Sequence, residues 1–138
     1  MRFEGQIKRA GRLWLIEAPA FDLVTQGRSR GEAFAMFTDA LRSLCGKERL
    51  ETLIFAKKHC AAFEFSASDD DCLVALLLRR QRQKHGLTLK AVACKLGSTS
   101  VNAYARYEQG RARPTLAKLG QLLRAVSPDL APVLKLAA

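Results

Sequence analysis

The sequence of 138 residues lacks a long apolar run and contains few cysteines, prolines and aromatic residues. Its longest apolar run, residues 73–78, is too short to cross a membrane, and the chain enters an alternating pattern at Phe3 without a signal peptide. These absences favour a cytoplasmic protein. An apolar share of 49% with 26% charged residues is typical of a globular chain.

Motifs for metal and redox chemistry are also missing. The four cysteines are too far apart for a CxxC motif, and their apolar neighbours predict reduced, buried thiols. The two histidines have no identifiable partner, and we expect them to be solvated. We expect no cofactor and no metal site, and we interpret three aspartates at residues 69–71 as a helix cap. The cysteines are Cys45, Cys60, Cys72 and Cys94, and the histidines are His59 and His85.

Acidic residues are scarce in the second half of the chain. Residues 69–138 contain 12 of the 23 Lys and Arg residues but only 5 of the 13 Asp and Glu residues. A basic surface attracts polyanions, although it is weak evidence without a binding motif in the same region.

The chain is long enough for one ordinary domain or two small ones. A polar and acidic linker at residues 66–71 separates two regions of different pattern. We therefore predict an α+β domain over residues 1–68 and an all-α domain of four to five helices over residues 69–138.

Strand patterns surround one helix pattern in the first domain. Ser29 and Glu32 have the spacing of a capping box, which predicts a helix that begins near Arg30 and ends at Gly46. Its apolar side must lie on a sheet, so the domain should be an antiparallel sheet with one packed helix. Strands are expected over residues 3–8, 13–16, 23–26 and 62–66, whereas residues 49–58 fit either a short helix or a strand.

Two functional questions arise within this domain. Trp14 in the second strand is explained either by core packing or by contact with a partner. Hydrolysis of a phosphodiester would need clustered carboxylates or a positioned base, and no spacing brings the acids together. We therefore predict that the protein is not an enzyme. The acids concerned are Glu4, Glu17, Asp22 and Glu64.

A helix-turn-helix pattern occupies residues 86–110. Thr88 is placed to cap a first short helix, Gly97 ends it, and Tyr104 and Tyr107 anchor a second helix. A basic helix precedes this pattern, and a final amphipathic helix follows it. A helix that is held rigidly and shows small, hydrogen-bonding residues outward fits the major groove of DNA.

Exposed positions around the second helix are the candidates for DNA contacts. Asn102 has the chemistry to pair with adenine, Val101 to touch a thymine methyl group, and Arg106 to reach guanine or phosphate. Thr99 and Ser100 are candidates for positioning the protein on the DNA backbone. The alternative for each is solvated surface. Further phosphate candidates are Arg79, Arg80, Arg111 and Arg113.

The first half resembles the N-terminal domain of HicB-type antitoxins, from FEGQIKRAGRLWLIEAPAF through LVTQGRSRGEAFAMFTDALRSL. The resemblance implies a partial ribonuclease-H-like sheet without nuclease activity, which binds and blocks a small HicA-like toxin protein. We take Trp14, Phe21 and Asp22 as candidate residues for contact with this partner. Residues 18–22 stand where many relatives have a Pro-Asp-Leu-Pro-Gly type of loop.

The second half resembles the Cro/cI-type (XRE) helix-turn-helix family, from LRRQRQKHGLTLKAVACKLG to the pattern R-x-x-P-T-L-x-K-L-x-x-L-L. Family members commonly have Gln where this sequence has Leu89. The turn that contains residues 98–100 makes the segment one residue longer than the usual spacing, which leaves the register of base contacts open by one.

Together these patterns predict an antitoxin that neutralises a small ribonuclease toxin and represses its own operon by binding operator DNA. A single reading helix covers few base pairs, so we expect a homodimer or a higher even oligomer on a palindromic operator. The alternative is a stand-alone repressor whose N-terminal domain senses a ligand or dimerises. An active nuclease is the least favoured reading.

Overall fold

The computed structural model describes residues 1–135. The chain divides into two compact units, Met1–Leu76 and Leu77–Ala138, and the boundary falls within helix α2, Asp70–Lys84. The predicted linker is therefore shorter than expected, because Ser66 and Ala67 belong to strand β5 and Asp70 already belongs to α2. No helix in the described part of the chain is both long and apolar enough to cross a membrane.

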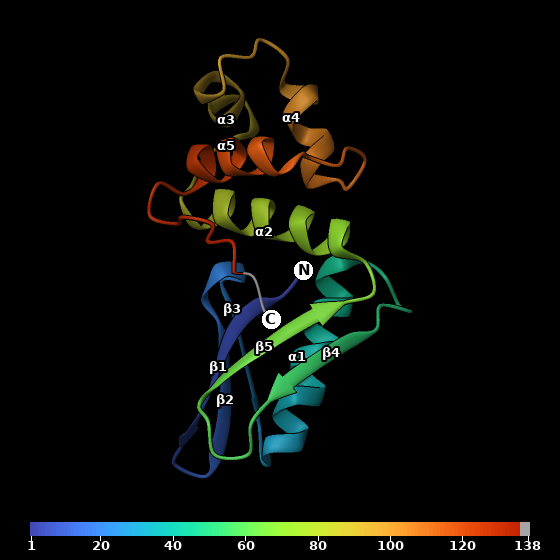
Figure 1. Cartoon of the computed structure of the whole chain (residues 1–138), viewed down its shortest axis with the longest axis vertical. Coiled ribbons are helices and arrows are strands. Elements are labelled where there is room, and N and C mark those ends of the chain that lie inside the picture. The colour runs from blue at the N-terminus through green and yellow to red at the C-terminus, as the bar shows by residue number, and fades with distance from the viewer. Residues whose placement is uncertain (136–138) are drawn as a thin grey trace. The chain divides into compact units, whose positions relative to one another are not determined.

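Unit 1 is a five-stranded antiparallel sheet with one long helix, so the predicted α+β class is confirmed (Figure 1). The strand order is β3-β2-β1-β5-β4, which makes β3 and β4 the two edges. Residues 49–58, which fitted either helix or strand, contain an edge strand. The strands are β1 Phe3–Ala10, β2 Leu13–Ala18, β3 Leu23–Gly27, β4 Thr52–Ala56 and β5 Ala62–Ala67, with a short 3-10 helix, Pro19–Phe21, after β2.

Helix α1, Arg30–Cys45, begins and ends where its cap signals predict. The Ser29 hydroxyl accepts from the Glu32 amide at 3.0 Å, and the Glu32 carboxylate accepts from the Arg28 amide at 2.6 Å. Gly46 ends the helix in the left-handed region, with φ of +64°. Both ends of α1 are therefore specified by local chemistry.

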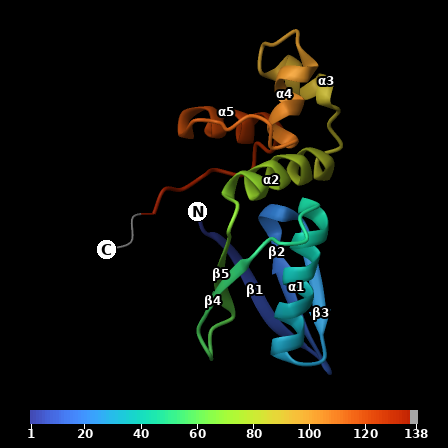
Figure 2. The same ribbon diagram turned by 90° about the vertical axis from the view of Figure 1, so that its right-hand side faces the viewer.

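The core of unit 1 lies between α1 and one face of the sheet (Figure 2). Phe37 of α1 meets Phe63 and Phe65 of β5 edge to face, with ring centroids 5.7 and 5.0 Å apart. Phe21 closes the same cluster against Phe3 and Phe65. At the start of α1 the backbone passes so close to Gly27 that a Cβ there would lie 2.3 Å from the Ala33 nitrogen.

Unit 2 is all-α, and hydroxyl side chains cap three of its helices. Thr88, Ser100 and Thr115 each accept a hydrogen bond from the amide three residues later. Together with α2, the helices of the described residues are α3 Leu89–Lys95, α4 Val101–Glu108 and α5 Leu116–Val126. The predicted four to five helices are thus found.

The cysteines do not all behave as predicted. Each is a free thiol, but only Cys72 is buried, Cys45 is half-buried, and Cys60 and Cys94 are exposed. The prediction of burial is wrong for Cys60 because it lies in the exposed β4–β5 turn. It is wrong for Cys94 because this residue lies on the outer side of α3, opposite buried Val92 and Ala93.

Candidate DNA-binding interface

Helix α4 exposes a row of polar side chains. Ser100 caps the helix through its hydroxyl, which accepts from the Ala103 amide at 3.2 Å. Asn102 and Arg106 lie one turn apart and are both exposed, whereas Tyr104 on the inner side is only 2% exposed. Gln109, one turn further on, is also exposed and extends the same row beyond the predicted residues. The row combines amide and guanidinium groups, which suit the edges of bases.

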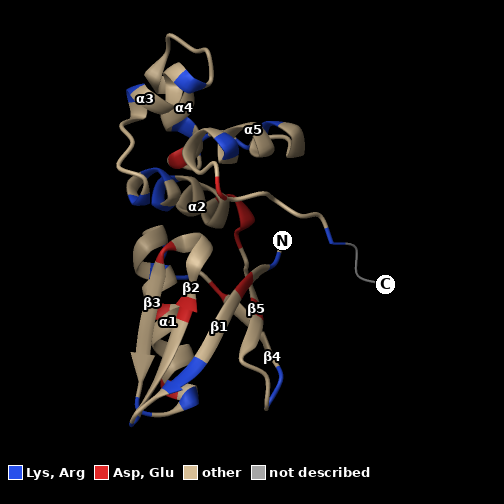
Figure 3. Cartoon of the chain, turned by 90° about the vertical axis from the view of Figure 1, so that its left-hand side faces the viewer, with Lys and Arg blue, Asp and Glu red and all other residues tan. Residues whose placement is uncertain are grey.

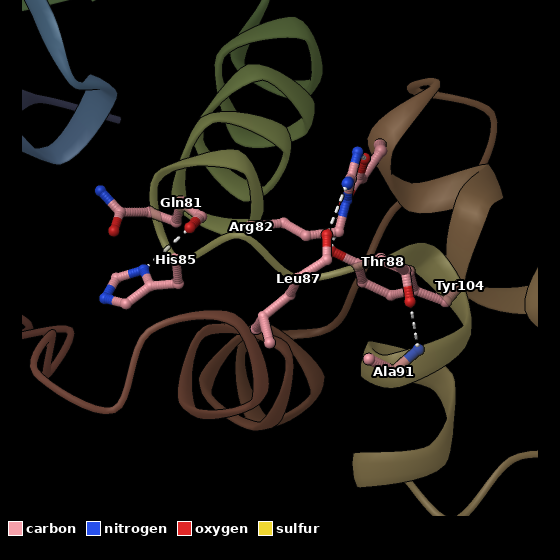
Figure 4. A network of polar contacts seen from close by, with 8 residues as sticks. Gln81, Arg82, His85, Leu87, Thr88, Ala91 and Tyr104 are labelled. Carbon is pink, nitrogen blue, oxygen red and sulfur yellow. Dashed lines mark hydrogen bonds and ion pairs between the residues drawn. The ribbon is translucent and has the colours of Figure 1, made fainter.

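A buried ion pair holds the inner side of α4 against α2 (Figure 4). Arg82 of α2 donates from Nε to Glu108 Oε1 at 2.7 Å and from Nη2 to Oε2 at 3.0 Å. The Tyr104 hydroxyl donates to the same carboxylate at 2.5 Å. The side chain of Glu108 is 6% exposed and that of Arg82 is 16% exposed, so water screens this pair weakly.

The third donor of Arg82 extends the same contact to the start of the helix-turn-helix. Its Nη1 donates to the Leu87 carbonyl at 2.9 Å, one residue before the Thr88 cap of α3. One guanidinium therefore connects three segments: the end of α2, the entry to α3 and the last turn of α4. This network sets the orientation of α4 relative to α3.

The network also raises the pKa values of two of its members, Arg82 and Tyr104. The hydrogen bond to Glu108 raises the pKa of the Arg82 guanidinium. Burial, followed by the hydrogen bond to Glu108, raises the pKa of Tyr104 far above its ordinary value of 10. Tyr104 therefore remains a neutral hydrogen-bond donor over the physiological range.

The turn between α3 and α4 is built from polar residues and one glycine. Gly97 adopts φ of +70°, and the Ser98 hydroxyl accepts from the Ser100 amide at 3.1 Å. Thr99 and Ser100 are exposed, whereas Val101 is half-buried. The Ser100 hydroxyl accepts one hydrogen bond in its cap and keeps its O–H group as a donor that suits a phosphate oxygen.

The arginines predicted as phosphate contacts fall into two groups. Arg111 and Arg113 are exposed in the loop after α4, whereas Arg79 and Arg80 are half-buried on α2. Figure 3 shows basic residues on every helix of unit 2. The sequence from α3 to α5 contains one acidic residue, Glu108. The positive charge expected from the sequence is thus spread around α4.

The candidate partner-binding residues of unit 1 do not form one exposed surface. Trp14 is half-buried on β2, with the Arg30 guanidinium 5.9 Å from its ring. Phe21 is fully buried in the aromatic core, so a partner contact through its ring is not supported. Asp22 is exposed, and its φ of +47° is the only positive value at a non-glycine residue in the described chain.

The acids considered for nuclease chemistry are distributed over the sheet. Glu4 and Glu64 are directly opposite each other across β1 and β5, a proximity that the sequence did not predict. Glu64 is paired with Arg2 at 3.1 Å, and Glu17 with Lys8 at 2.7 Å. Within residues 1–135, no three His, Cys, Asp or Glu side chains gather in a way that could hold a metal ion.

His85 departs from the predicted solvated state. Its Nδ1 lies 2.9 Å from the Gln81 carbonyl oxygen, and its Nε2 lies 3.7 Å from Asp129. The first contact lies at the end of α2, whereas the second brings the residue after α2 close to Asp129 in the segment after α5. His59 is exposed, as expected.

Comparison with known proteins bears on unit 2. Residues 78–126 match the family model for a helix-turn-helix, and this range runs from α2 through α5. No curated protein matches the chain. Unit 2 therefore carries a helix-turn-helix of the Cro/cI type, a domain through which transcription regulators bind double-stranded DNA in a sequence-specific manner.

Proposed function

We propose that this protein is an antitoxin-type repressor of its own operon. In this proposal α4 reads a palindromic operator, two copies of the chain bind adjacent half-sites, and unit 1 binds and blocks a small ribonuclease toxin. The observation that carries the DNA half is the exposed row of Asn102, Arg106 and Gln109 on a helix fixed from behind by Arg82.

Recognition follows from the chemistry of this row. Asn102 pairs with an adenine edge and Arg106 with guanine or a phosphate, while Val101, half-buried at the start of α4, touches a thymine methyl group. Thr99, Ser100 and the arginines at Arg111 and Arg113 contact phosphates and orient the domain. The net charge of +10 adds binding that is independent of sequence and sensitive to salt.

The test of the DNA half is the double variant Asn102→Ala with Arg106→Ala. We expect it to lose at least about tenfold in preference for operator over random DNA, because the base contacts disappear while the phosphate contacts remain. Electrophoretic mobility shifts with the DNA upstream of the operon measure this ratio. Arg124→Ala, an exposed arginine on α5, is the matched control. Unchanged specificity in the double variant would mean that α4 is not the reading helix.

The toxin half rests on the resemblance of residues 3–44 to HicB-type antitoxins. The antiparallel sheet with a single capped helix, α1, agrees with the fold which that resemblance implies. Co-purification of the chain from its native operon tests this half directly. A small basic protein that co-elutes, and whose ribonuclease activity returns when the chain is removed, is the expected result.

A second candidate is a stand-alone repressor whose N-terminal unit only dimerises. The exposed apolar side chains of the edge strand β4 favour it, because they offer a contact surface that needs no toxin. Co-purification separates the two candidates, since this one predicts no small partner protein.

A further inference from the structure

The edge strand β4 carries large apolar side chains in exposed positions. It is the last strand of the order β3-β2-β1-β5-β4, so no strand of the described residues pairs with its outer edge. Leu53 is 61% exposed and Phe55 is 38% exposed. An edge with apolar side chains and free backbone groups is a template for pairing with another strand.

The backbone of β4 shows which groups face outward. The Glu51 carbonyl accepts from the Ser68 amide at 2.9 Å, so the backbone N–H and C=O groups of Glu51 face the side of β5. Alternate residues of an antiparallel strand direct their amide and carbonyl groups to opposite sides. The groups that face the open edge therefore belong to Thr52, Ile54 and Ala56.

The register shows on which face of the sheet the apolar side chains lie. Ile54 is opposite Phe65, which packs under α1, whereas Phe55 is opposite Glu64. Residues directly opposite each other share a face, so Leu53 and Phe55 lie on the face away from α1. The Arg2 guanidinium covers one side of the Phe55 ring at 3.8 Å.

The segment around β4 is complementary to itself. When two copies run antiparallel with Ile54 opposite Ile54, Glu51 of each copy meets Lys57 of the other, and Leu53 meets Phe55. Ile54 would form a hydrogen-bonded pair through its outward groups, which leaves Leu53 and Phe55 in the closer, non-hydrogen-bonded pairs. If the two-fold axis moves by one residue from Ile54, Glu51 lies opposite Phe55 or His59. Both the charged pair with Lys57 and the apolar pair of Leu53 with Phe55 are then lost.

We propose that the β4 edge binds the same edge of a second copy of this chain and joins two sheets around a two-fold axis at Ile54. The proposed function requires two copies of the chain on the operator, and this inference identifies the residues that join them. The biological role of the β4 dimer therefore rests on the proposed function. Each charged pair and each apolar pair occurs twice, because a two-fold interface repeats every contact.

The other edge of the sheet is less suited to this role. Strand β3 exposes one large apolar residue, Val24, which is 63% exposed. Strand β3 cannot be lengthened at either end. Asp22 before it has a left-handed backbone, and the Arg28 amide after it donates to the Glu32 carboxylate. Val24 therefore provides a control position with nearly the same exposure as Leu53.

Sedimentation velocity of the full chain over a concentration series tests the proposal. Wild type should dimerise, and Leu53→Lys should raise the dimer dissociation constant at least about tenfold, because the symmetry places the change in the interface twice. Val24→Lys should leave the constant unchanged. Circular dichroism of each variant establishes that unit 1 remains folded.

A charge exchange tests the register. Glu51→Lys and Lys57→Glu should each weaken the dimer, and the double variant should recover it, because opposite charges again meet across the two-fold axis. A monomeric wild type, equal effects of Leu53→Lys and Val24→Lys, or a double variant no better than the single ones would overturn the proposal. If the chain dimerises and binds operator DNA, but Leu53→Lys does not weaken the dimer, only the β4 pairing is overturned. If Leu53→Lys weakens the dimer, but the wild-type dimer does not bind operator DNA, only the proposed DNA function is overturned.

Discussion

At the scale of single residues, Arg82 and Glu108 determine how α4 is presented. Glu108 accepts two hydrogen bonds from Arg82 and one from Tyr104 in a site that water reaches poorly. Removing one member of a buried ion pair costs more than the pair contributes, because the remaining charge stays buried. Both residues therefore fix the position of α4 relative to α2.

We predict that Glu108→Gln lowers the free energy of unfolding of unit 2 by about 3 kcal/mol, since it leaves the Arg82 charge without a counter-ion. Tyr104→Phe should cost about 1 kcal/mol, because it removes one hydrogen bond and keeps the ion pair. Urea unfolding followed by circular dichroism measures both values. Equal costs for the two variants would contradict the central role of the ion pair.

Asp69 provides a prediction for the dependence of stability on pH. The hydrogen bond from Lys47, followed by that from the Cys72 amide, lowers the pKa of Asp69 below its ordinary value of 3.8. The unfolded chain therefore binds a proton more readily, and the stability that Asp69 contributes is lost as pH falls through the lowered pKa. Asp69→Asn keeps an oxygen that accepts from the Cys72 amide but removes the titrating carboxyl group. The unfolding midpoint of this variant should therefore fall less steeply than that of wild type as the pH is lowered into the acid range. Asp39→Asn, which removes an exposed carboxylate of α1 that is paired with Arg42 at 3.1 Å, is the control for the loss of a surface charge.

Contacts between distant residues limit what the sequence can predict at this scale. Glu108 was recognisable as part of the helix-turn-helix pattern, but its partner Arg82 lies 26 residues away on another helix. No local period links two such positions. The burial of Phe21 was not predictable for a related reason, since its neighbours Phe3 and Phe65 approach it only after the sheet forms.

At the scale of elements, the close approach of α1 to the end of β3 depends on Gly27. A Cβ on Gly27 would lie 2.3 Å from the Ala33 nitrogen and 2.8 Å from the Glu32 carbonyl carbon, both of which are backbone atoms that cannot rotate away. By contrast, the nearest atom to a Cβ on Gly31 is the Ser29 oxygen at 4.0 Å. The two glycines are four residues apart in sequence but differ in what surrounds them.

Gly27→Ala should therefore destabilise unit 1 by about 2 to 3 kcal/mol, because α1 must move away from the sheet. Gly31→Ala should be neutral or should stabilise the unit by up to about 1 kcal/mol, since alanine favours the helix. Thermal unfolding monitored by circular dichroism compares the two. A tolerated alanine at Gly27 would show that α1 is not held at this distance.

Helices were more predictable than strands because their signals are local. Ser29 and Thr88 each indicate a helix start within four residues, and the structure places the starts there. Strand β4 was ambiguous because apolar Leu53 and Phe55 lie on its exposed face, which removes the alternation that identifies a half-buried strand. The row on α4 was identified through Asn102 and Arg106, but Gln109 was missed because it follows the last helical residue.

At the scale of the whole molecule, the two units differ in how far their roles are established. The family match covers residues 78–126 and gives unit 2 a DNA-binding role. The role of unit 1 remains a proposal, because a sheet with one helix is compatible with many functions. The net charge of the chain does not distinguish an antitoxin from a stand-alone repressor, because both need a basic surface toward DNA.

The division of the chain into units also divides its chromophores. The single tryptophan, Trp14, lies on β2 of unit 1, while both tyrosines, Tyr104 and Tyr107, lie on α4 of unit 2. Tryptophan emission, excited at wavelengths where tyrosine does not absorb, therefore reports the surroundings of Trp14 in unit 1. Without any added label, the unfolding of unit 1 can thus be followed by itself, while circular dichroism of the same sample follows the helices of both units.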